Sequence, residues 1–170
     1  AIHLLWINLV TDGLPALALS IDPISKDIMK RKPRKKESHI IDKEMLYSII
    51  IIGILIAIAT LFLFKRSLNS GLIYAQTIAF TTLVILEIVR LQMVRSRFKL
   101  GFFTNKYLII AVASSIFLQL LVIYTPLSNV FHTTALRLVD FVAIIIVGII
   151  LYVAGIFINR LFDKVKVNRI

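Results

Sequence analysis

Residues 45–64 read MLYSIIIIGILIAIATLFLF and contain no charged side chain. A helix of about 20 apolar residues is long enough to cross the hydrocarbon core of a bilayer. Four further runs of similar length lie at about 2–21, 74–93, 107–124 and 139–159. These runs do not alternate polar and apolar residues, and backbone polar groups in lipid must be satisfied within each segment. The predicted fold is therefore all-α, a polytopic transmembrane helix bundle of about five spans.

The composition agrees with a membrane protein. Of the 170 residues, 59% are hydrophobic, and the mean hydropathy is +0.92. A soluble domain of this size could not bury so much apolar surface. There is no cysteine, which excludes a disulfide framework and thiol chemistry. The chain starts with Ala and enters an apolar run at once, so we expect no signal peptide and a C-terminal piece of a longer protein.

The positions of the basic residues predict the topology. The formal net charge is +11, and seventeen of the twenty Lys and Arg residues lie within 22–44, 90–106 and 160–170. Because basic residues collect on the cytoplasmic side, these segments are predicted to be a cytoplasmic loop, a second cytoplasmic loop and a cytoplasmic tail. Residue 1 is then outside, in a multi-pass protein of the cell membrane. The charge is explained by topology, so no nucleic-acid partner is expected, and lipid headgroup binding by KRKPRKK (30–36) is a less favoured alternative.

The first span differs from the others because it carries polar residues. Residues 3–21 read HLLWINLVTDGLPALALSI, in which Asn8, Thr11 and Asp12 have the i, i+3, i+4 spacing of one helix face. A charge inside a bilayer is costly and usually marks an ion or proton path. All three side chains offer oxygen, which hard cations such as Ca²⁺ prefer. The alternative is an ordinary proline kink whose polar residues are satisfied by neighbouring helices.

Two helix-weakening residues follow the carboxylate. Pro15 has no N–H for the carbonyl of Thr11, and Gly13 weakens the helix beside it. We therefore expect the first span to be partly unwound at Gly13–Pro15, with a free carbonyl next to the three side-chain oxygens. Irregular backbone at membrane depth is tolerated where it lines a site.

Glu87 in the third predicted span is the second carboxylate expected at this site. Its alternative role is an i, i+3 ion pair with Arg90, which would neutralise it. Ca²⁺ takes about 6–8 oxygens, more than this chain offers, so helices outside it or water would supply the remainder. The predicted metal ligands are Asn8, Thr11, Asp12 and Glu87, and no catalytic or cofactor-binding residue is predicted.

The stretch LLWINLVTDGLPALALSIDP (4–23) closely resembles the sixth transmembrane segment of P-type cation-transporting ATPases, in the branch of the calcium pumps. The following DPISKDIMKRKPR (22–34) resembles the cytoplasmic loop after that segment. The five spans then correspond to segments six to ten, and the resemblance covers essentially the whole chain.

The resemblance implies residue roles. Asn8, Thr11 and Asp12 match the ion ligands of segment six, and Asp12 matches the residue shared between two ion sites. Glu87 matches the carboxylate of segment eight that completes one site. The loop at 22–44 matches the one that contacts the phosphorylation domain.

This sequence departs from the family pattern at Arg90, which is unexpected beside Glu87, and in the short loop at 65–73. It contains no Asp-Lys-Thr-Gly-Thr, so the chain alone is not expected to hydrolyse ATP. We interpret it as the membrane part of an ATP-driven cation pump, most consistent with Ca²⁺, acting with the lipid bilayer and the remaining helices and cytoplasmic domains of the pump. ATP and Mg²⁺ would bind only outside this chain. The alternatives are a stand-alone cation or proton transporter or channel, and a non-transporting membrane subunit.

Overall fold

The computed structural model describes residues 1–23, 43–97 and 100–167, and these residues form helices and connecting turns without a β-strand. The first span is built of three consecutive helical pieces. The elements in chain order are α1 (Ile2–Trp6), η1 (Ile7–Gly13), α2 (Leu14–Ser20), α3 (Lys43–Ser67), η3 (Leu68–Ser70), α4 (Leu72–Arg97), η4 (Phe102–Thr104), α5 (Lys106–Tyr124), α6 (Leu127–Phe131) and α7 (Leu138–Val167).

Within the described residues, five helices are long enough and apolar enough to cross a membrane. They are Ile2–Ser20, Met45–Ser70, Leu72–Ser96, Lys106–Tyr124 and Leu138–Asn159. The predicted all-α bundle of five spans is confirmed. The basic segments predicted at 22–44 and 160–170 fall largely outside the described residues or side chains.

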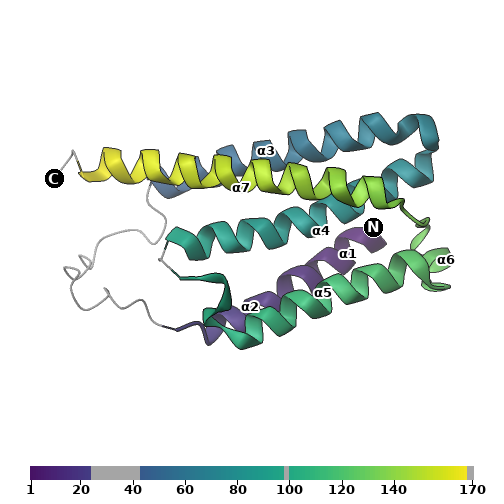
Figure 1. The fold of residues 1–170 in the computed structure, drawn as a ribbon, viewed down its shortest axis with the longest axis horizontal. Helices are drawn as coiled ribbons and strands as arrows, with labels where there is room; N and C mark the ends of the chain where they lie inside the picture. The colour runs from purple at the N-terminus through teal and green to yellow at the C-terminus, as the bar shows by residue number, and fades with distance from the viewer. Residues whose placement is uncertain (24–42, 98–99, 168–170) are drawn as a thin grey trace.

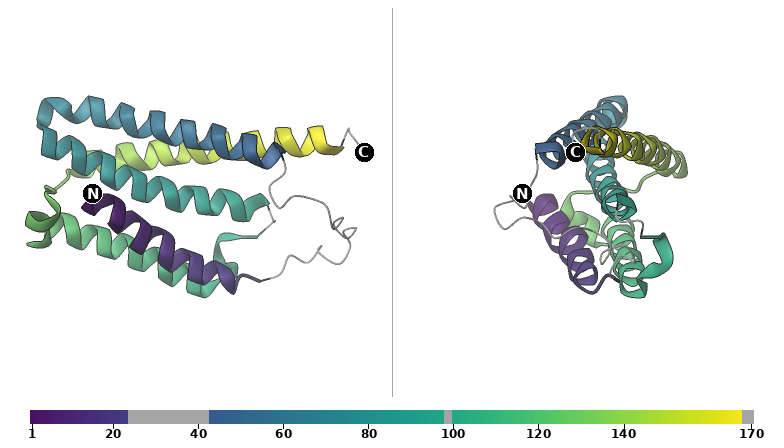
Figure 2. Two further views of the ribbon diagram at one scale, coloured as in Figure 1. Left: turned by 180° about the vertical axis from the view of Figure 1, so that it is seen from behind. Right: turned by 90° about the vertical axis from the view of Figure 1, so that its left-hand side faces the viewer.

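The helix α4 lies at the centre of the bundle. The end-on view in Figure 2 shows α3 and α7 on one side of α4, and the first span and α5 on the other. The packing agrees, because α4 contacts α3, α7, η1 and α5. Since α4 is packed on two opposite sides, it is the most buried of the spans.

Three apolar clusters hold α4 to its neighbours, and two of them lie on its opposite sides. One joins the first span, α4, α5 and α6 through buried Ile7, Phe80, Val84, Val122 and Phe131. The other joins α3, α4 and α7 through buried Ile52, Ile56, Leu86, Met93 and Leu151. Glycine at position 155 leaves room for the Met93 side chain between α7 and α4, because a Cβ there would lie too close to the Met93 sulfur and would force that side chain to shift.

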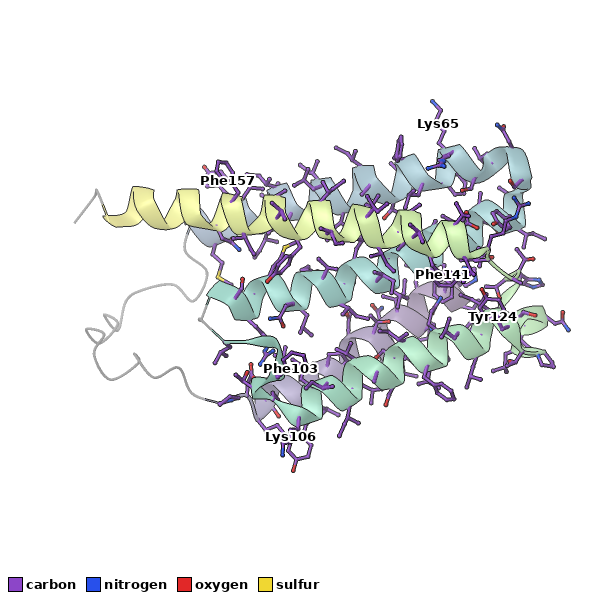
Figure 3. All side chains as sticks on the ribbon, in the orientation of Figure 1. Lys65, Phe103, Lys106, Tyr124, Phe141 and Phe157 are labelled. Atoms are coloured by element: carbon purple, nitrogen blue, oxygen red, sulfur yellow. The ribbon has the colours of Figure 1, made fainter. Side chains whose placement is uncertain are left out.

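The outer surfaces of the helices are apolar. Phe157 of α7 is 63% exposed and points away from the bundle in Figure 3. Leucine and isoleucine side chains of α3 and α7 are exposed in the same way, for example Leu61 and Ile150. A surface of this kind on helices of spanning length is typical of contact with lipid.

The two chain ends lie at opposite ends of the bundle. Figure 1 shows the N-terminus near the turn between α3 and α4 and near α6, whereas α7 finishes at the far end. The described ends of α2 and α4, and the start of α5, share the end where the C-terminal helix finishes. Because five spans run up and down in turn, the first span starts at one end of the bundle and the last span finishes at the other. The helix ends that adjoin the predicted cytoplasmic loops and tail therefore lie at one end of the bundle.

Candidate cation-binding site

Three of the four predicted ligands lie in a π-helical segment. The segment η1 spans Ile7–Gly13 and so includes Asn8, Thr11 and Asp12. The π-helix, with its i→i+5 hydrogen bonds, is rare, and it occurs frequently at functional sites. The irregularity predicted from the sequence is therefore present, but its form and its position differ from the prediction.

The predicted unwinding at Gly13–Pro15 is wrong. Gly13 has φ −63° and ψ −53°, and Leu14 has φ −63° and ψ −48°, so both residues remain helical. Pro15 stands in the first turn of α2, where a missing N–H is tolerated. The wider turn of η1, just before Pro15, keeps the span helical while it changes which carbonyls are paired.

A side chain of α5 reaches the backbone of η1. Ser115 is fully buried, and its hydroxyl donates a hydrogen bond to the carbonyl oxygen of Val10 at 2.9 Å. The sequence predicted a free carbonyl at Thr11, whereas the hydrogen bond from Ser115 reaches the carbonyl of Val10, one residue earlier. The Val10 carbonyl is therefore paired with α5. The free Thr11 carbonyl stays a prediction.

Two further hydrogen bonds join α1, α5 and α4 through Gln119. The indole N–H of Trp6 donates to Oε1 of Gln119 at 3.2 Å, and Nε2 of Gln119 donates to the Thr81 hydroxyl at 3.3 Å. We did not predict Ser115 or Gln119 as part of this region. Their i, i+4 spacing in an otherwise apolar span was the signal that could have indicated a helix face turned toward polar backbone.

The three ligands predicted in η1 divide between two environments. Asn8 and Asp12 are exposed on the surface of the bundle, whereas Thr11 is buried, with 3% of its surface exposed. The Thr11 hydroxyl has no hydrogen-bond partner among the described residues. Buried polar groups are almost always paired, so an orphan hydroxyl beside an uncovered amide and carboxylate is an unusual local feature.

Glu87 lies on α4 and is paired with Arg90. The Nη1 of Arg90 donates to Oε1 at 3.2 Å and to Oε2 at 3.1 Å, and the Glu87 side chain is 24% exposed. The ion pair that we considered as the alternative role is therefore present. Asp12 lies on η1, which packs against α4, so the structure places the two predicted carboxylates on neighbouring helices.

The described residues do not enclose a cation by themselves. Within 1–23, 43–97 and 100–167 there is no group of three or more His, Cys, Asp or Glu side chains that could hold a metal ion. The chain instead presents oxygens from two helices, η1 and α4, which pack against each other. Carboxylate, amide and hydroxyl oxygens fit a hard cation such as Ca²⁺, which needs more of them than this arrangement supplies.

Comparison with known proteins gives consistent results. The family model described as "Cation transporting ATPase, C-terminus" matches residues 1–161. The "Calcium-transporting ATPase" of Bacillus subtilis is 43% identical over 151 residues, which are 85% of this chain and 17% of that protein. The "Calcium-transporting ATPase 1" of Bacillus cereus is 34% identical over 189 residues, which are 98% of this chain and 21% of that protein. The human "Calcium-transporting ATPase type 2C member 1" is 36% identical over 147 residues, which are 82% of this chain and 16% of that protein. This chain thus spans about a fifth or less of the length of these relatives.

Proposed function

Because this chain belongs to the family of P-type cation-transporting ATPases and matches their C-terminal membrane region, we propose that it forms part of the ion pathway of an ATP-driven Ca²⁺ pump. Asn8, Thr11 and Asp12 of the first span would contribute oxygens, and Glu87 of α4 would add a second carboxylate. Ca²⁺ is the transported substrate in this proposal. The relatives are ATPases by name, which favours a pump over a stand-alone channel.

One observation carries the proposal. The π-helical segment η1 presents Asn8 and Asp12 on a face that the described helices leave uncovered, next to α4 with Glu87. A carboxylate at membrane depth is too costly to face lipid, so further protein must cover this face. We infer that helices of the complete pump, outside this chain, complete the coordination shell.

The proposed orientation follows from the charges. The first residue lies on the outer side of the cell membrane, and the end of the bundle where α2 and α4 finish faces the cytoplasm. ATP and Mg²⁺ act through domains outside this chain. Phosphorylation there would shift the first span, so that Asp12 and its neighbours bind the ion from the cytoplasm and release it outside.

The substitution Asp12→Asn in the complete pump tests the proposal. It keeps the size of the side chain and removes the charge that attracts the cation. We expect Ca²⁺-dependent phosphorylation by ATP to be abolished, while the amount of protein in the membrane stays normal.

Asp140→Asn is the matched control. Asp140 is a carboxylate near the start of α7, where it accepts a hydrogen bond from the Tyr74 hydroxyl, at the opposite end of α4 from Arg95. The same chemical change there should leave Ca²⁺-dependent phosphorylation in place. Normal Ca²⁺-dependent phosphorylation of the Asp12→Asn pump would contradict the assignment, whatever the control shows.

A further inference from the structure

A buried arginine joins three helices at the end of the bundle where α2 and α4 finish. The side chain of Arg95 is 2% exposed. Its Nε donates to Oδ2 of Asp22 at 2.9 Å, and its Nη2 donates to Oδ1 of the same carboxylate at 3.0 Å. The guanidinium also donates to Oε1 of Gln92 at 3.2 Å and to the Thr104 hydroxyl at 2.7 Å.

Asn105 completes the arrangement from the start of α5. Its Nδ2 donates to Oδ1 of Asp22 at 3.0 Å and to the carbonyl oxygen of Ala18 at 2.8 Å. Its Oδ1 accepts from the backbone N–H of Leu108 and so caps the N-terminus of α5. One residue therefore bonds to the end of the first span and to the first turn of α5. We refer to Asp22, Arg95 and Asn105 together as the clamp.

The clamp is electrically matched. Burial raises the pKa of the Asp22 carboxyl. The hydrogen bonds from Arg95 and Asn105, together with the charge of Arg95, lower that pKa by more than burial raises it, so the net shift is downward. The carboxylate is therefore ionised at neutral pH. Bidentate arginine–carboxylate pairs fix both the distance and the relative orientation of their two groups.

The clamp and the candidate site share the same two helices. Asp12 lies ten residues before Asp22 in the first span, and Glu87 lies eight residues before Arg95 in α4. At about 1.5 Å per residue, the two carboxylates lie about 12–15 Å from the clamp along their helices. A clamp at this position fixes the register of η1 against α4, and hence the relative position of Asp12 and Glu87.

Few buried apolar contacts lie near the clamp, whereas the larger cluster that joins the first span to α4, with Ile7, Phe80 and Val84, lies farther along both helices. The neighbouring cluster of α2 and α5 is small, with Ala18, Leu108 and Ala111 as its buried members. Small apolar side chains tolerate sliding, whereas a two-point ion pair with a third partner does not. Within the described residues, the clamp is the buried ion pair that connects the first span with α4.

From this geometry we propose that the Asp22–Arg95 pair, oriented by Asn105, is a positioning device that sets the cation affinity of the site formed by η1 and α4. The proposal rests on the proposed function. None of the three residues touches the ion; they act through the register of the two helices that carry Asp12 and Glu87.

The test is the Ca²⁺ dependence of phosphorylation by ATP in the complete pump. Asp22→Glu keeps the charge but lengthens the side chain by one methylene, and Arg95→Gln leaves the carboxylate without its cation. We expect the Ca²⁺ concentration for half-maximal phosphorylation to rise about fivefold or more in both variants, because substitutions away from a ligand can change coupling by this amount. The maximal phosphorylation per pump should remain, since the ligands themselves are intact.

Ser48→Ala is the matched control for a structural effect. The Ser48 hydroxyl donates to Oδ1 of Asn159 at 2.9 Å, a buried polar bond that ties α3 to α7 and involves neither ligand-bearing helix. Its loss should leave the Ca²⁺ dependence unchanged.

The possible results distinguish failure of the inference from failure of the proposed function. If Ser48→Ala shifts the Ca²⁺ dependence as much as Asp22→Glu does, or if Asp22→Glu assembles normally and shows no shift, the positioning role is overturned while the pump assignment stands. If Arg95→Gln fails to accumulate in the membrane, Asp22→Glu decides the question. If the unsubstituted pump shows no Ca²⁺-dependent phosphorylation, the proposed function is overturned and the inference with it.

Discussion

At the scale of single residues, the pairing of Glu87 with Arg90 determines what α4 can offer a cation. Both carboxylate oxygens of Glu87 are within 3.2 Å of one guanidinium nitrogen, yet the Arg90 side chain is 52% exposed. Both residues lie in the membrane-spanning part of α4, so water does not screen this pair as it screens a surface ion pair. A divalent cation near Asp12 therefore competes with Arg90 for Glu87, and the positive charge of Arg90 opposes the approach of that cation.

We predict that Arg90→Gln in the complete pump increases the apparent affinity for Ca²⁺. Removing the guanidinium frees both oxygens of Glu87 and removes the repulsion, so the half-maximal Ca²⁺ concentration should fall by about threefold or more, within the range by which a single substitution changes coupling between sites. The measurement is Ca²⁺-dependent phosphorylation by ATP. Lys106→Gln, which removes an exposed positive charge at the start of α5, should have little effect.

Glu87→Gln distinguishes the two roles of this carboxylate. A ligand role predicts that this variant needs more Ca²⁺ than the unsubstituted pump does. If Glu87 serves Arg90 alone, Glu87→Gln leaves the Ca²⁺ dependence unchanged, and the ligand set then reduces to the residues of the first span.

At the scale of the element, the first span shows what sequence reasoning can and cannot predict. The polar segment with Asn8, Thr11 and Asp12 and a defect near Pro15 followed from the sequence and from the missing proline N–H, whereas the single shared face did not, because Thr11 is buried and the other two are exposed. The form of the defect did not follow, because a missing donor can be accommodated by unwinding or by a wider turn. Tertiary partners far along the chain decide between the two, and here Ser115 bonds to Val10 across 105 positions.

The same limit applies to the clamp. Arg95 looked like one of many basic residues near a cytoplasmic helix end, and in the structure it is among the most deeply buried side chains. Its partner Asp22 lies 73 positions away, a separation at which spacing rules give no information. Helix-forming runs and same-face residues are local properties and could be predicted, whereas ion pairs between elements depend on packing.

We predict that Pro15→Ala weakens Ca²⁺ binding although no ligand is changed. The restored N–H at position 15 allows an ordinary α-helical turn in place of the π-helical one. A π-helical turn holds one residue more than an α-helical turn, so its loss rotates the residues before position 15 by about 100° around the helix axis. Thr11 and Asp12 would then turn away from α4. The expected result is a rise of about tenfold in the Ca²⁺ needed for half-maximal phosphorylation, the size typical of losing a supporting contact at a metal site.

Pro126→Ala provides the comparison for this experiment. Pro126 is exposed at the N-cap of the short helix α6, outside the first span. It should leave the Ca²⁺ dependence unaltered. An unchanged Ca²⁺ dependence in Pro15→Ala would show that the π-helical turn is not required for the site.

At the scale of the whole molecule, the bundle has a surface of two kinds. Along their middle parts, α3 and α7 expose apolar side chains, as expected against lipid, whereas η1 exposes an amide and a carboxylate. These two kinds of surface need different neighbours. The chain therefore has a lipid-facing side formed largely by α3 and α7 and a protein-facing side at the first span, which fits a part of a larger membrane domain that packs beside other helices.

The orientation of this bundle in the membrane can be tested with introduced thiols, because the chain contains no cysteine. Asn69 is exposed in the turn between α3 and α4, and Phe103, 86% exposed, lies near the start of α5 at the other end of the bundle (Figure 3). Neither substitution alters the basic residues that predict the topology. In the complete protein, with any cysteines outside this chain replaced, a membrane-impermeant maleimide applied to intact cells should label Asn69→Cys and leave Phe103→Cys unlabelled. Both should react once the membrane is permeabilised, which shows that each thiol is accessible. The reverse pattern would place the clamp and the C-terminal ends of α2 and α4 outside the cell and would contradict the proposed orientation, in which the ion enters from the cytoplasm at that end.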